Sequence, residues 1–221
     1  MNRYWYFLVL VSFLFSCSKN DDVNIIYDKV FKEEIIVKDT LKKYSIKDTI
    51  WFEIIPDSIN IEENTGEKVN LRNTTYILSG VINLLKPQYD SLVFIDRNFD
   101  VVEKRGNILL INILNATQSS YSFDVEFGEL SNTNSAEFGI ITDYPGIFAI
   151  DFEGLVFYGE NRTQYDDFSI ENKGHLDLIF GNEDTNDSIY NSLPSDYKYK
   201  YDSYYNKRIL KNKVYFIEVN E

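Results

Sequence analysis

The chain has 221 residues, of which 44% are hydrophobic and 16% aromatic, and its formal net charge is −13 at pH 7. This apolar content is sufficient for a core and excludes a globally disordered chain. The acidic balance disfavours nucleic acids and anionic lipid head groups, because their phosphates repel negative charge. We therefore expect an acidic, folded protein with no nucleic-acid partner.

The N-terminus has the layout of an export signal. Asn2 and Arg3 precede an apolar run over residues 4–15, which is too short to span a bilayer as a helix. Ser16-Cys17 follows directly, and Cys17 is the only cysteine, so no disulfide framework occupies it. A cysteine behind a small residue at the end of such a run resembles the lipobox of bacterial lipoproteins. An ordinary signal peptide and an uncleaved anchor are the alternatives.

The resemblance implies cleavage before Cys17 and acylation of this residue, which attaches the protein to a membrane through its N-terminal lipid. The polar residues 18–22 end in two carboxylates and resemble the acidic export tag of Bacteroidetes-type outer-membrane lipoproteins. That tag implies display at the cell surface, with a periplasm-facing outer-membrane lipoprotein as the alternative. We expect a signal peptide over residues 1–16, then the acylated cysteine and a flexible tether over residues 17–30.

Residues 31–221 predict an all-β domain. Short runs of β-branched and aromatic residues alternate with turn clusters at intervals of roughly 8–12 residues, which is typical of an antiparallel β-sandwich, Ig-like or jelly-roll-like. No Gly-rich or Pro-rich linker interrupts them, so one domain is favoured over two small sandwiches that split near residues 116–120. Removal of the signal deletes Arg3 and no acidic residue, which brings the formal charge to −14.

The expected strands, in chain order, are 49–55, 74–78, 81–85, 91–95, 107–114, 121–127, 138–142, 147–152, 155–158, 176–180 and 214–219. One or two short helices are expected near the C-terminus, over residues 187–193, halted by Pro194, and over residues 203–211. The core is expected around a set of large apolar residues: Trp51, Ile77, Phe123, Phe148, Phe157 and Phe216.

No residue set typical of catalysis stands out. His175 is the only histidine, no G-x-S-x-G motif occurs, and we interpret His175 as a structural residue before a strand. Zinc has no ligand set. Asn182, Asp184 and Asn186 have the 1-3-5 spacing of a calcium loop but lack its glycine and its final glutamate, so we interpret them as a solvated acidic loop. We predict no catalytic residue, no metal and no cofactor.

The tripeptide Asp-Ser/Thr-Ile/Leu occurs five times. It resembles the acceptor site for O-linked glycans on exported Bacteroidetes proteins, where the hydroxyl carries the sugar. Asp and Ser/Thr also form side-chain-to-backbone turns before strands, which is the structural alternative. The candidate acceptor residues are Thr40, Thr49, Ser58, Ser91 and Ser188.

Residues 197–213 form a basic region in this acidic chain, with six basic residues, one acidic residue and a formal charge of +5. If the segment is extended, Tyr197, Tyr199 and Tyr201 share one face. Exposed tyrosine rings beside cations can stack on sugars, which makes these three residues candidates for glycan binding. Alternatively, the tyrosines cover one end of the sandwich and the lysines are solvated.

These patterns predict a membrane-anchored envelope lipoprotein. Its domain is expected to be a non-catalytic module that binds an extracellular polymer, either a glycan or an envelope protein. A small secreted glycan hydrolase and a structural or adhesin subunit are the alternatives. The first requires two carboxylates that converge in a cleft, and the second predicts an exposed apolar edge strand.

Overall fold

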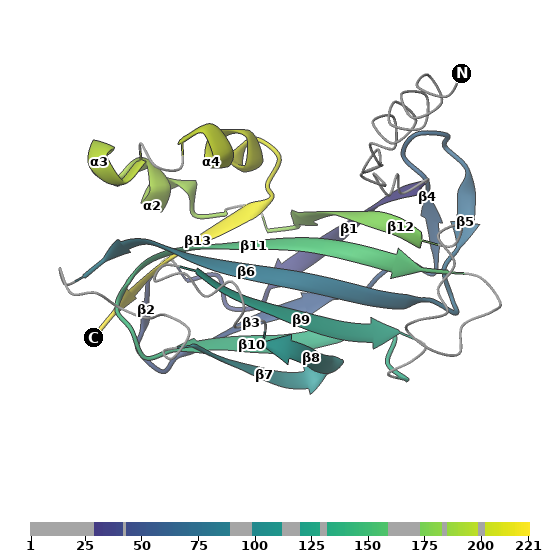
Figure 1. Ribbon diagram of the computed structural model, residues 1–221, viewed down its shortest axis with the longest axis horizontal. Helices are drawn as coiled ribbons and strands as arrows, with labels where there is room; N and C mark the ends of the chain where they lie inside the picture. Colours follow the sequence, from purple (N-terminus) through teal and green to yellow (C-terminus); the bar gives the residue numbers. More distant parts are fainter. Residues whose placement is uncertain are drawn as a thin grey trace, which may run out of the picture.

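The computed structural model describes residues 29–41, 43–88, 99–111, 120–128, 132–158, 173–182, 185–198 and 202–221. These residues form mainly β-strands, with short helices late in the chain (Figure 1). The predicted all-β class with short C-terminal helices is confirmed. Residues 1–16, Cys17, Ser91, Tyr199 and Tyr201 lie outside the described residues.

Eleven strands form one continuous sheet. The strands of its main path are, in spatial order, β7 (Phe99–Arg105), β10 (Ala136–Thr142), β3 (Thr49–Ile54), β1 (Lys29–Val37), β12 (Lys173–Phe180), β11 (Gly146–Phe157), β6 (Thr75–Pro87), β9 (Ser120–Gly128) and β8 (Asn107–Ile111). Off this path, β13 (Val214–Asn220) pairs with β11 and with β2 (Lys43–Ser45). A separate hairpin consists of β4 (Ile59–Ile61) and β5 (Lys68–Asn70). Strand pairs are antiparallel except β1–β12 and β2–β13.

The two ends of the sheet path come together because β7 and β8 are consecutive in the chain. Gly106 alone separates them, and its φ of +96° is one that glycine adopts at little steric cost. Across the interior, the ring of Phe123 on β9 lies 5.7 Å from that of Phe138 on β10. The two layers of the predicted sandwich are therefore parts of one curled, nearly closed sheet (Figure 1).

Aromatic rings fill the inner face of this sheet. Alternate residues of each strand point inward, so Phe52 of β3, Phe138 of β10 and Phe152 of β11 meet with ring centroids 5.3 to 5.7 Å apart. Edge-to-face contacts between rings stabilise a core beyond the burial of their area. The result is a single contiguous core that links strands distant in sequence.

Five of the six residues predicted for the core are buried: Ile77, Phe123, Phe148, Phe157 and Phe216. The prediction is wrong for Trp51. Its neighbours Ile50 and Phe52 both point inward, so the strand period places the Trp51 ring on the outer face. There it is half-buried beneath Lys104, whose Nζ lies 3.7 Å from the ring centroid.

In two places the structure forms one long strand where the sequence predicts two short ones. The runs 74–78 and 81–85 both fall in β6, which begins at Thr75, and the runs 147–152 and 155–158 both fall in β11, which ends at Phe157. Gly80 sits opposite the Phe123 ring, where an added Cβ would lie 2.3 Å from Cζ. Gly154 makes room for Leu176 in the same way, at 2.8 Å. These glycines mark close packing inside strands and not turns.

The sequence does not predict β1, β2, β4, β5 or β7. β1 begins at Lys29, within the segment expected to be a tether, and its inward-facing Glu33 interrupts the apolar alternation that identifies a strand. Strands on the two sides of residues 116–120 pair directly, as β6 does with β9 and β3 with β10. The described sheet is thus continuous across that point.

Three short helices, α2 (Asp187–Asn191), α3 (Ser195–Lys198) and α4 (Asp202–Ile209), cover the outer face of β11 and β13 (Figure 1). α2 and α4 confirm the two predicted helices. The rings of Tyr190 and Tyr205 pack on Phe216 of β13 with centroids 5.2 and 5.8 Å away. These contacts form a second apolar cluster outside the barrel.

Candidate functional site

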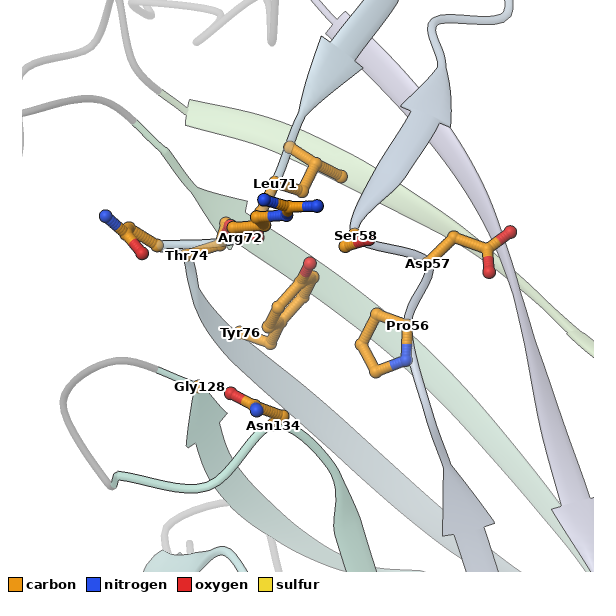
Figure 2. Close-up of a pocket in the computed structure, with 10 residues that line it drawn as sticks. Pro56, Asp57, Ser58, Leu71, Arg72, Thr74, Tyr76, Gly128 and Asn134 are labelled. Carbon is orange, nitrogen blue, oxygen red and sulfur yellow. Dashed lines mark hydrogen bonds between the residues drawn. The ribbon is translucent and has the colours of Figure 1, made fainter.

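A pocket of about 420 Å³ opens at the end of the barrel that carries the β4–β5 hairpin. Three segments line it: the link from β3 to β4, the link from β5 into β6, and the region from the end of β9 toward β10 (Figure 2). Its volume falls in the range of small-ligand sites, roughly 300–1,000 Å³. The lining residues are Pro56, Asp57, Ser58, Leu71, Arg72, Asn73, Thr74, Tyr76, Gly128 and Asn134.

Hydrogen bonds hold the first two walls of the pocket together. The Leu71 N–H donates to the Ser58 carbonyl at 2.9 Å, and the Thr74 hydroxyl donates to the Leu71 carbonyl. The Arg72 N–H donates to Oδ1 of Asn70 at 3.1 Å, which fixes the backbone from which the Arg72 side chain leaves. The two walls are therefore positioned before any ligand arrives.

The third wall is placed by Gly128, at the end of β9. Its φ is +107°, and a Cβ there would lie 2.0 Å from the Thr74 carbonyl oxygen. Only glycine allows the two backbones to approach so closely. Gly128 and Thr133 also exchange backbone hydrogen bonds, which hold the residue next to Asn134 against the end of β9.

Tyr76 forms the apolar floor of the pocket. Tyr76 is 4% exposed. Its ring stacks on that of Phe127 in the neighbouring strand, with centroids 4.9 Å apart and planes 8° from parallel. Figure 2 shows the hydroxyl end of Tyr76 directed into the pocket, toward Leu71 and Arg72. The site thus combines a rigid aromatic ring with hydrogen-bonding groups around it.

A buried carboxyl group lies next to the first wall. The Asn60 side chain donates to Oε1 of Glu33 at 2.6 Å and to the Lys32 carbonyl at 3.1 Å, which ties β4 to β1. Burial raises the pKa of Glu33 to about 7, and the hydrogen bonds from Asn60 and from the Asp57 backbone only partly offset this effect. Glu33 therefore titrates near neutral pH in the folded protein.

Glu62 anchors the other side of the same hairpin. Its carboxylate accepts the Thr65 hydroxyl at 2.6 Å and the N–H groups of Val30, Asn64 and Thr65 at 2.7 to 3.1 Å. These hydrogen bonds, with the Thr65 hydroxyl first, lower the pKa of Glu62 to about 2. The ionised carboxylate joins the β4–β5 turn to the start of β1.

A smaller groove of about 280 Å³ lies on the outer face of the sheet, and its lining residues are Ser79, Glu153, Gly154, Leu155 and His175. Beside it, Asp151 is buried beneath α4. Its carboxylate accepts the Tyr204 hydroxyl at 2.8 Å and pairs with the Arg208 guanidinium. Burial raises the pKa of Asp151, and Arg208 counteracts this effect. Since both oxygens are engaged, we interpret this carboxylate as the attachment point of α4.

The structure separates the predicted glycan acceptors. Thr40, Ser58 and Ser188 are exposed, whereas Thr49, at the start of β3, is half-buried. Ser91 lies outside the described residues. Ser58 also lines the pocket, so the motif and the candidate site coincide at this residue.

Of the three tyrosines predicted to bind a glycan, only Tyr197 is among the described residues. Tyr197 lies in helix α3 and is half-buried, so strand alternation does not apply to it. Tyr199 and Tyr201 lie outside the described residues. Tyr205, farther along the same segment, is fully buried against β13.

Asn182 and Asn186 bind backbone groups, and Asp184, the third residue of this motif, lies outside the described residues. The Asn182 side chain accepts the N–H of Val37 at 2.9 Å and donates to its carbonyl at 3.0 Å. The Asn186 amide, 2% exposed, donates to the carbonyls of Leu41 and Phe216. The prediction of solvation is therefore wrong for Asn186, because its amide nitrogen carries two hydrogens and can satisfy two backbone carbonyls at once.

Among the described residues, no three His, Cys, Asp or Glu side chains are grouped so that they could hold a metal ion. In the same part of the chain, none of the helices has the length and apolar character needed to cross a membrane. No protein-family model matches the chain, and no curated protein matches its sequence.

Sequence reasoning missed most of the pocket. Pro56-Asp57 appears in the sequence only as the end of a strand, and Tyr76 only as a strand residue. Arg72 and Asn134 carry no motif at all. The Asn73-Thr74-Thr75 run before β6 is a turn signal, but nothing in it indicates that Gly128 will pack against Thr74.

Proposed function

We propose that the protein is an outer-membrane lipoprotein displayed at the cell surface through lipidated Cys17. Its β domain is a non-catalytic module that binds an extracellular glycan in the pocket around Tyr76. The observation that supports this function is the pocket itself, whose three walls are held against one another around a stacked aromatic floor. Fixed walls reduce the entropy that binding would otherwise cost.

The lining favours binding over hydrolysis. A glycoside hydrolase of the common type needs two carboxyl groups on either side of the scissile bond. Asp57 is the only carboxylate among the ten lining residues, and Figure 2 shows its side chain turned away from Tyr76. Hydroxyl, amide and guanidinium groups around an aromatic ring are suited to sugar hydroxyls and ring faces.

A protein partner is the second candidate. Three isoleucines beside the first wall are exposed: Ile55 by 63%, and Ile59 and Ile61 by 54% each. Ile59 and Ile61 share the face of β4 opposite Asn60, which points toward β1. Exposed apolar residues grouped on one short strand are a feature of protein-binding surfaces.

Binding is tested with the full chain purified in detergent, on a glycan array and in a pull-down from envelope extracts. Asn134→Ala and Tyr76→Phe should weaken glycan binding, whereas Ser188→Ala, on α2 outside the pocket, should leave it unchanged. Binding that survives both pocket substitutions would refute the site. Capture of a protein that is lost with Ile59→Ser and Ile61→Ser would favour the second candidate.

Anchoring is tested by replacing Cys17 with Ala. The variant should leave the membrane fraction and lose the mass of the acyl chains. Stable attachment takes about two chains, since each buried methylene contributes roughly 0.8 kcal/mol. A membrane-bound variant of unchanged lipid mass would contradict the proposal, and protease treatment of intact cells distinguishes surface display from the periplasmic orientation.

We also propose O-glycosylation at the Asp-Ser/Thr-Ile/Leu motifs. Exposure of Thr40, Ser58 and Ser188 supports modification of these three, and the half-buried Thr49 is the weakest acceptor. Replacement of each hydroxyl residue by Ala should lower the intact mass stepwise. A native mass equal to that of the chain plus its lipid would contradict glycosylation, and the turn interpretation of the motifs would remain. A glycan on Ser58 would occupy the pocket mouth, so Ser58→Ala should then improve ligand binding.

A further inference from the structure

We propose that Arg72 makes the pocket selective for a glycan that carries a carboxylate. This inference rests on the proposed function, because it names the class of ligand for the same site. The shared chemistry is an acidic sugar within an otherwise neutral glycan, recognised through one guanidinium group.

The first observation is the position of the side chain. Arg72 leaves a turn fixed by the hydrogen bond between its own N–H and Asn70. Figure 2 shows its guanidinium over the pocket, between Leu71 and Ser58 and above the hydroxyl end of Tyr76. The carboxylate of Asp57 points in another direction and forms no ion pair with Arg72. A ligand in the pocket therefore meets the cation directly.

The second observation is that Arg72 differs from the other described arginines. Arg105 pairs with two carboxylates, Glu53 and Glu137. Arg208 pairs with Asp151 and lies 3.9 Å from Glu153. Among the described residues, Arg72 has no carboxylate within ion-pair distance. In a protein with 35 acidic and 22 basic residues, a pocket arginine with no acidic partner among the described residues is a candidate anion site.

The chemistry of the group defines the ligand. A guanidinium presents a planar fork that matches the two oxygens of a carboxylate, and such pairs give orientation as well as affinity. The Ser58 hydroxyl, the Asn134 amide and the Tyr76 ring surround it and can bind the rest of the sugar. The geometry therefore fits a uronic-acid-type residue with its carboxylate toward Arg72.

The net charge limits how acidic the ligand can be. A mature domain with a formal charge of −14 repels a continuous polyanion. A glycan with one carboxylate between neutral sugars can pair with Arg72 and avoids most of the repulsion that a polyanion would meet. We therefore expect isolated acidic sugars to bind more tightly than polyuronates of the same length.

The experiment compares matched oligosaccharides on several neutral backbones. Each pair consists of one oligomer with a single glucuronic acid and the same oligomer with that carboxylate reduced to an alcohol. The full chain in detergent is titrated with each member. Wild-type protein should bind the acidic member of at least one pair about tenfold more tightly, which corresponds to about 1.4 kcal/mol.

Arg72→Gln should abolish this preference, and Arg72→Lys should retain only part of it because the fork is lost. Lys207→Gln, an exposed charge change on α4, is the matched control and should behave as wild type. Thermal melts establish that all three variants fold.

Equal binding of both members of every pair would overturn the role of Arg72 and leave the glycan-binding function intact. A preference that persists in Arg72→Gln would overturn the assignment of selectivity to this residue. Tighter binding of a sulfated oligomer would overturn the inference that the preferred acidic group is a carboxylate. Binding of no oligosaccharide would refute this inference and the proposed function together.

Discussion

The helix-covered face and the pocket end of the barrel use the same residue types in opposite ways. Under α4, the buried Asp151 carboxylate pairs with the Arg208 guanidinium and accepts the Tyr204 hydroxyl, so opposite charges are matched. At the pocket end, Glu33 is buried with amide donors, and the described residues place no cation beside Glu33 and no carboxylate beside Arg72. The matched pair attaches α4, whereas the unmatched Arg72 is the group on which we base the proposed ligand preference.

The largest effect is expected from breaking the matched pair. Arg208→Ala leaves the Asp151 carboxylate buried without its cation, which should lower the free energy of unfolding by about 4 kcal/mol. Urea denaturation measures this change, with Lys207→Ala on the same helix as the control. A double substitution, Asp151→Asn with Arg208→Met, should recover part of the loss. If Arg208→Ala costs less than about 1 kcal/mol, the pair does not hold α4 in place.

Gly128→Ala tests whether the pocket walls need their close approach. The added Cβ would meet the Thr74 carbonyl at 2.0 Å and adopt a φ of +107°, so we expect a loss of about 3 kcal/mol and of ligand binding. Gly66→Ala is a matched control, because Gly66 also has a positive φ, +72°, but has no atom near its Cβ position. That variant should cost only about 1 kcal/mol. Equal losses in the two variants would show that wall packing contributes nothing.

Glu33→Gln sharpens the contrast at the pocket end. A carboxyl whose folded pKa is about 7, raised from 4.5, stabilises the fold fully below pH 4.5 and loses that contribution as the pH rises through 7. The neutral variant should therefore be more stable than wild type by about 3 kcal/mol at pH 8 and equal to it near pH 4. Urea titrations at the two pH values measure the difference, with the exposed neighbour Glu34→Gln as the control. A stability difference that does not change with pH would contradict the raised pKa.

Sequence period predicted the parts of the fold that depend on local pattern. The alternation over residues 121–127 is the inward-outward pattern of β9, and the run over 214–219 is β13. The same period could not predict that the strands continue through Gly80 and Gly154. A glycine that packs against a side chain distant in sequence has the same local signature as a glycine in a turn. The parallel pairing of β1 with β12 joins residues about 145 apart, and no local signal encodes such a partner.

The candidate site was less predictable than the fold. Ser58 was singled out for its tripeptide, and its place in the pocket depends on the hydrogen bond between its carbonyl and Leu71. Arg72 and Asn134 become neighbours of one cavity only after the hairpin and the turn beyond β9 have folded. A pocket lined by three separate links between strands has no contiguous sequence that could reveal it.

The start of β1 and the pocket lie at the same end of the barrel, and this has a mechanical consequence. The Val30 N–H bonds to Glu62, in the hairpin whose flanking residues Ser58 and Leu71 form two pocket walls. Eleven residues separate Cys17 from Lys29, so a lipid at Cys17 would keep this end within about 40 Å of the bilayer. Tension on a bound polymer would then pass through the hairpin into β1 and out along the tether. Because β3 and β12 flank β1, the load would act along the strand on many backbone bonds together, and most of the barrel would carry none of it.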